Sequence, residues 1–136
     1  MPQALILAMA THVALAAFLY VLLTIARAPA VWGLGRRADG SNPWAALEPR
    51  ISANLSNQFE WPLFFHLACL FFLQFHATQT AVVLAWVFVG GRILHSAVQI
   101  LTINMRLRGL VFTINFVAVL GMWYLLVSAS GTAAAA

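Results

Sequence analysis

The sequence predicts an all-α integral membrane protein built as a bundle of four transmembrane helices. Of its 136 residues, 63% are hydrophobic and only 7% are charged, and a soluble domain of this length could not bury so much apolar surface. The apolar residues fall into long runs, as they do in helices that cross the hydrocarbon core of a bilayer. Four such spans use nearly the whole chain, so we expect residues 1–136 to form one membrane domain.

The first span is predicted over residues 4–25, an apolar run interrupted only by Thr11, His12 and Thr24. Its length matches the roughly 20 residues that a helix needs to cross the bilayer. A cleaved signal peptide is the alternative, but the run is too long for one and no basic residue precedes it. We therefore expect a retained membrane helix, followed by an irregular loop over residues 26–49.

The second span is predicted over residues 50–75 as one long helix. Its strongly apolar part begins only at Trp61, so it is too short to cross the membrane unless the helix starts upstream. Proline is well tolerated in a first helical turn, and an acidic residue there suits the positive end of the helix dipole. Pro49, preceded by Glu48, therefore marks the expected start.

The third and fourth spans are predicted over residues 80–103 and 109–127. A short connection at residues 76–79 joins the second span to the third, and residues 104–108 join the third to the fourth. Cys69 is the single cysteine, so we expect no intramolecular disulfide and interpret it as a small buried hydrophobic residue.

The arginines predict the orientation of these spans. All seven basic residues are arginine, and six of them lie in or beside the first and third connections: Arg27, Arg36, Arg37, Arg50, Arg106 and Arg108. Basic residues in short loops stay in the cytoplasm, so we expect loops 26–49 and 104–108 there and both termini outside. This orientation explains the net charge of +4, and we expect no nucleic-acid partner. The use of arginine without lysine, together with many alanines, is typical of a GC-rich bacterial genome, so we expect the bacterial inner membrane as the location.

Polar residues at membrane depth are costly, and this chain has two lines of them. On the second span they are spaced by four, three and three residues: Arg50, Asn54, Asn57 and Glu60. On the third span they are spaced by three, four and seven residues: Arg92, His95, Gln99 and Arg106. Either spacing places its residues along one face of a helix.

Pairing the two spans about the connection at residues 76–79 brings the polar lines to the same depth. Glu60 then lies about three residues from the level of Arg92, and Asn57 lies beside Gln99. This predicts a pocket in the cytoplasmic half of the bundle that suits a small, multiply anionic ligand, because arginines bind carboxylates through paired hydrogen bonds. The alternative is a structural ion pair between Glu60 and Arg92 that only holds the helices together.

Three short motifs follow one another along residues 48–124. The first, in EPRISANLSNQFEWP, comprises Arg50, Asn57 and Glu60. The second, in GRILHS, comprises Arg92, His95 and Ser96, and the third is Arg108, Gly109 and Leu110. In these motifs the chain resembles the membrane-associated proteins in eicosanoid and glutathione metabolism (MAPEG), and especially a bacterial-type branch. That family includes microsomal glutathione transferases and leukotriene and prostaglandin synthases.

The resemblance implies a homotrimer of four-helix subunits that binds glutathione at subunit interfaces near the cytoplasmic face. It implies glutathione-dependent transfer, peroxide reduction or isomerisation of lipophilic substrates that arrive from membrane lipid. The residues that the pattern assigns to glutathione are Arg50, Asn57, Glu60, Arg92 and His95, with Asn54 and Gln99 on the same polar lines. Arg108, or as a second choice Arg106, would hold the glutathione thiol as the nucleophilic thiolate.

The chain departs from the family pattern at three positions. Ala53 replaces a second arginine, Gln99 stands where well-studied members have a tyrosine, and Pro62 follows the glutamate unusually early. A different low-molecular-weight thiol, or a non-catalytic lipid-binding or scaffold role on the same fold, therefore stays open.

Two further classes of function are disfavoured. The histidines at positions 12, 66 and 76 lack partners at metal-ligand spacing, so we expect packing roles for them and no metal. A transporter or channel needs a polar path across the whole bilayer, whereas both polar lines are predicted in its cytoplasmic half.

Overall fold

The computed structural model describes residues 1–134, with side chains as far as residue 129. Over these residues the chain forms helices and no strands, which confirms the predicted all-α class. The helices are α1 (Pro2–Trp32), α2 (Glu48–Ser56), α3 (Pro62–Gln74), α4 (Gln79–Leu101) and α5 (Met105–Ala134).

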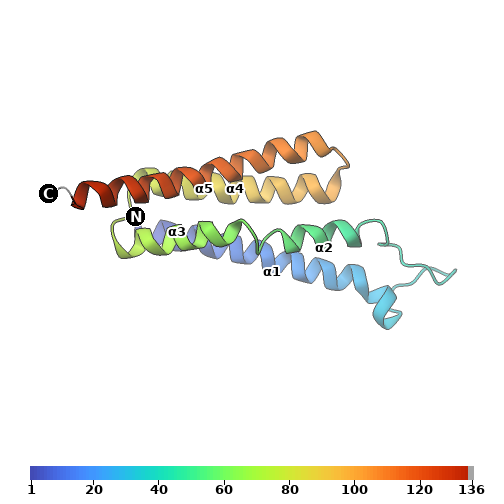
Figure 1. The fold of residues 1–136 in the computed structure, drawn as a ribbon. Coiled ribbons are helices and arrows are strands. Elements are labelled where there is room, and N and C mark those ends of the chain that lie inside the picture. The colour runs from blue at the N-terminus through green and yellow to red at the C-terminus, as the bar shows by residue number, and fades with distance from the viewer. Residues whose placement is uncertain (135–136) are drawn as a thin grey trace.

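The helices run along one common long axis (Figure 1). α2 and α3 follow one another beside α1, while α4 and α5 lie side by side along the other half of the bundle. The N-terminus and the end of α5 lie where α3 connects to α4, and the long α1–α2 loop lies at the opposite end with the α4–α5 connection. The first and third connections therefore share one end of the molecule.

The second predicted span is not one continuous helix, and that expectation was wrong. α2 ends at Ser56 and α3 begins at Pro62. Between them the N–H groups of Gln58 and Phe59 bond to carbonyls three residues back rather than four. Pro62 has no N–H, and in a continuous helix its ring would clash with the carbonyl of Gln58. The helix therefore stops and restarts with proline in its first turn.

The start of α2 and the end of α1 are set by local chemistry. α2 begins at Glu48 with Pro49 in its first turn, as the sequence predicts. α1 continues to Trp32, so the first part of the predicted loop is helical. It ends at Gly33, whose φ of 73° is a left-handed conformation that glycine adopts without strain. Arg27 of α1 pairs with Glu48 at 2.6 Å and ties the two helices together.

Three helices are long and apolar enough to cross a membrane, namely α1, α4 and α5 up to residue 129. α3 is apolar but has only 13 residues, or about 20 Å at 1.5 Å per residue. Large apolar side chains cover the outer surface of all of these helices, including Phe18, Leu70, Val87 and Val117. A surface of this kind suits contact with lipid or with another subunit.

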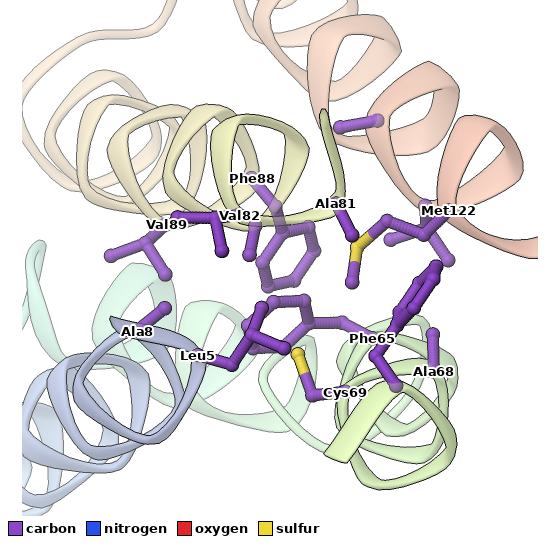
Figure 2. Packing of buried hydrophobic residues seen from close by; sticks show 14 residues of the cluster. Leu5, Ala8, Phe65, Ala68, Cys69, Ala81, Val82, Phe88, Val89 and Met122 are labelled. Atoms are coloured by element: carbon purple, nitrogen blue, oxygen red, sulfur yellow. The ribbon is translucent and has the colours of Figure 1, made fainter. Parts of the chain in front are cut away.

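Two apolar clusters form the interior. The larger one joins α1, α3, α4 and α5, and its centre is the stacked pair of Phe65 and Phe88, with ring centroids 4.2 Å apart. Figure 2 shows Cys69 and Met122 pointing into the same cluster. Cys69 is fully buried there, as predicted. The smaller cluster lies toward the other end, where Leu19, Leu23, Ala26, Ile51, Leu55 and Ile100 pack together.

Candidate functional site

A group of buried polar side chains from α1, α2, the α2–α3 break and α4 contrasts with these apolar clusters. Its members are His12, Asn54, Gln58, Arg92, His95, Ser96 and Gln99, each at most 7% exposed. Burying a polar group is costly unless it is hydrogen-bonded. Their partners therefore define how this part of the molecule is organised.

Gln58 lies at the centre of the group. Its Oε1 accepts a hydrogen bond from Arg92 Nε at 3.2 Å and lies 3.1 Å from His12 Nε2. Its Nε2 lies within hydrogen-bond distance of Asn54 Oδ1 and of Ser96 Oγ, both at 3.2 Å. Gln58 was not among the predicted site residues, although it follows Asn54 by four residues and so lies on the same side of a helix. In the structure it is buried inside the bundle, just after the end of α2.

The predicted amides of α2 and α4 do meet. Asn54 Nδ2 and Asn57 Nδ2 both donate to Gln99 Oε1, at 3.0 and 3.3 Å. The contact between Asn57 and Gln99 agrees with the register obtained by pairing the two spans about their short connection.

Arg92 is completely buried and is held by neutral groups. Besides its bond to Gln58, its Nη2 donates to the backbone carbonyl of Asn57 at 3.0 Å. Glu60 is exposed, and the only ion pair among the described side chains joins Arg27 to Glu48. Glu60 and Arg92 therefore make no direct ion pair among the described side chains, although their charges still interact. Because α2 ends at Ser56, Glu60 does not continue the polar face of that helix.

Three predicted residues line one cavity of about 300 Å³, which we call the arginine cavity. It lies between the start of α2, the end of α4 and the start of α5, and its lining includes Arg50, Gln99 and Arg108. Arg50 Nη1 donates to the carbonyl of Ile100 at 3.4 Å, and the guanidinium of Arg108 makes no hydrogen bond to the side chains or backbone of residues 1–129. Two cations thus face one cavity whose lining contains no carboxylate.

The other predicted residues lie outside this lining. Arg106 lies in α5, beyond the end of α4, so it does not extend the polar line of α4 as predicted; it is exposed, whereas Arg108 is partly buried. His95 is buried beside Phe112, with ring centroids 6.0 Å apart, and its Nδ1 has no hydrogen-bond partner in the described structure. Arg92 Nη1 is likewise buried without a partner.

Asn115 of α5 is a buried polar residue that the sequence analysis missed. It is fully buried, and neither amide atom has a hydrogen-bond partner within the described residues. Gly91 of α4 makes room for it, because a Cβ at that position would overlap Asn115 Oδ1. An asparagine in a long apolar run was a visible signal, but only the packing of α5 on α4 shows that it points inward.

A second cavity, which we call the histidine cavity, lies between α1 and α3 beside the helix break. Its volume is about 380 Å³, and its lining includes His12, Gln58 and His66. His12 Nδ1 lies 3.0 Å from His66 Nε2. This contact joins residues 54 positions apart, so no sequence spacing could reveal it.

The comparisons with known proteins agree with the resemblance seen in the sequence. A family model described as the MAPEG family matches residues 5–128, nearly the whole chain. No curated protein and no solved structure matches the chain.

Proposed function

The chain belongs to the MAPEG family. On that basis we propose that it is a membrane-bound, thiol-dependent enzyme: a transferase that conjugates the thiol to lipophilic electrophiles, or a peroxidase that reduces lipophilic peroxides. Its co-substrate is glutathione or another low-molecular-weight thiol. The observation that carries the proposal is the arginine cavity, where Arg50 and Arg108 face a common space without a carboxylate to neutralise them. Unpaired guanidinium groups at a concave site favour anionic ligands.

Within this cavity each group has a distinct task. Arg108 stabilises the thiolate, because a nearby cation favours the charged form of a thiol. Arg50 binds a carboxylate of the tripeptide, and Gln99 offers its amide to the peptide backbone. Asn54 and Asn57 hold Gln99 in place through its Oε1. They therefore position the ligand-binding side chain rather than contact the ligand themselves.

The transfer step needs no further protein cofactor. The thiol proton leaves to water, the thiolate sulfur forms a bond to the electrophilic carbon, and the leaving group departs with its electron pair. For a halonitrobenzene the products are the thioether and a halide ion.

The membrane arrangement that accompanies this function has four passes: α1, then α2 with α3, then α4 and α5. α3 alone is too short for a hydrocarbon core of roughly 30 Å, whereas α2 extends it along the bundle (Figure 1). The arginine cavity then lies at the cytoplasmic end, beside the arginine-bearing connections. Three subunits, packed through their apolar outer surfaces in a bacterial inner membrane, complete the proposed assembly.

The test is a titration of the purified protein in lipid nanodiscs with glutathione, followed by conjugation of 1-chloro-2,4-dinitrobenzene. Arg108→Gln is expected to lower kcat at least tenfold, because it removes one charge-assisted interaction. Arg37→Gln, in the exposed loop, is the matched control. Arg106→Gln discriminates between the two candidate arginines, and a larger loss there than at Arg108 would reverse their assignment.

The rival function is a non-catalytic lipid-binding or scaffold protein of the same fold. It is favoured by the apolar outer surface and by the histidine cavity, whose walls are mostly apolar. A protein that binds no glutathione at millimolar concentration, conjugates nothing and copurifies with a defined lipid would replace the enzyme proposal with this one.

A further inference from the structure

A buried hydrogen-bond network borders the histidine cavity through His12, Gln58 and His66, and its proton positions follow from its donors and acceptors. Arg92 Nε can only donate, so the Gln58 atom that faces it must be the oxygen. The opposite end of the same amide lies 3.3 Å from the backbone carbonyl of Asn54, which can only accept. Both contacts therefore fix the orientation of the Gln58 amide.

The orientation of Gln58 determines the tautomers of the two histidines. His12 Nε2 faces the Gln58 oxygen at 3.1 Å and must carry the proton. In a neutral ring His12 Nδ1 is then an acceptor, so His66 Nε2 donates to it across 3.0 Å. A neutral His66 that is protonated on Nε2 has a bare lone pair on Nδ1.

The remaining nitrogen of His66 is available to a ligand. His66 lines the cavity and is half-buried, and its Nδ1 makes no hydrogen bond within residues 1–129. Because Nε2 is directed at His12, Nδ1 lies on the side of the ring that faces away from His12. The cavity wall thus contains a histidine with one acceptor nitrogen, and a hydrogen-bonded chain that reaches Arg92 holds its ring in one tautomer.

The walls of the cavity favour a flat, apolar ligand. Val13, Ala16, Ala17 and Leu63 supply aliphatic surface. Tyr20 and Phe59 also line the cavity, and their rings meet edge to face with centroids 6.2 Å apart. Edge-to-face and offset contacts of this kind accept a further aromatic ring.

We propose that the histidine cavity binds a lipophilic phenol, whose hydroxyl group donates to His66 Nδ1 while its ring and alkyl chain pack on α1 and α3. The acceptor selects a ligand that carries an O–H donor, and the aromatic and aliphatic walls select a ring with an apolar tail. This site is separate from the arginine cavity and does not depend on thiol chemistry.

The test compares two ligands that differ only in the donor. Binding of 4-hexylphenol and of 4-hexylanisole is measured by equilibrium dialysis against nanodiscs with and without the protein, so that partition into lipid is subtracted. The phenol is expected to show saturable binding about tenfold tighter than the methyl ether, the effect of one lost hydrogen bond. Equal binding of the two ligands, or no binding above empty nanodiscs, would overturn the proposal.

Variants locate the site on the protein. His66→Phe keeps a ring but removes the acceptor, so it should abolish the preference for the phenol, whereas His76→Phe in the exposed α3–α4 connection should preserve it. Ala16→Phe should fill the cavity and weaken both ligands, with Ala14→Phe, an exposed position of α1 outside the lining, as its control. A phenol preference that survives in folded His66→Phe protein would contradict the assignment even if Ala16→Phe binds weakly.

Discussion

The arginine cavity and the histidine cavity are joined by one buried network, yet their polar groups differ in kind. In the first, Arg50 and Arg108 provide positive charge without a facing carboxylate. In the second, His66 provides a neutral acceptor among apolar walls. The link between them runs from His12 through Gln58 and Asn54 to Gln99. The comparison teaches that one buried hydrogen-bond network can connect two chemically distinct cavities, of which only the histidine cavity borders the break between α2 and α3.

The largest loss of stability is expected from Gln58→Leu, because Gln58 belongs to the network that links the two cavities. The change leaves Arg92 Nε and His12 Nε2 buried without their acceptor, and unsatisfied buried groups are costly. We expect the free energy of unfolding to fall by about 3 kcal/mol, measured by denaturation in detergent micelles.

The control is Gln74→Leu, at the exposed end of α3, which should change stability little. If Gln58→Leu protein is as stable as the wild type, or if it loses glutathione binding but keeps the preference for phenol over anisole, the two cavities do not share one network.

A smaller loss of stability is expected when the contact between α4 and α5 is disturbed. This contact positions Arg108 of α5 but does not involve His66. Gly91→Ala would force its new methyl group into Asn115, so we expect about 2 kcal/mol of destabilisation and weaker glutathione binding. Phenol binding should change less.

Gly90→Ala is the neighbouring control, since a Cβ there meets nothing within 4 Å. Adding Asn115→Ala to Gly91→Ala should restore stability, as measured by thermal unfolding. A Gly91→Ala protein that matches Gly90→Ala would show that this packing does not set the position of α5.

The smallest effect, a change in glutathione binding alone, is expected from Arg50→Gln, because Arg50 lines the arginine cavity and not the histidine cavity. Loss of one cation should weaken glutathione binding about tenfold and leave phenol binding unchanged, both measured by equilibrium dialysis. Arg37→Gln is the control for the change in net charge. Equal loss of both ligands would mean that the two cavities are not independent binding sites.

The sequence predicted the helical class and the meeting of α2 with α4 well, because both depend on local patterns. Apolar runs reveal helices, and the short connection after α3 fixes which residues of the neighbouring helix come level. Asn57 and Gln99 were paired correctly for that reason.

What the sequence could not give depends on the break and on distant packing. Pro62 was noted as a departure, but the extent of the interruption it causes follows from hydrogen bonds over residues 57–61. Within that interruption Glu60 is exposed, whereas Gln58 is buried beside Asn54. The contact between His12 and His66 arises from the packing of α1 on α3, which no periodicity encodes.

The most direct test of the central claim is whether the arginine cavity holds a thiol in its ionised form. Glutathione is added to the protein in nanodiscs at neutral pH, and the ultraviolet absorbance of the thiolate is followed, with S-methylglutathione as the ligand control. We predict a saturable thiolate signal for the wild type and for Arg37→Gln, and its loss in Arg108→Gln. No thiolate signal in the wild type, or an undiminished signal in folded Arg108→Gln protein, would contradict the account.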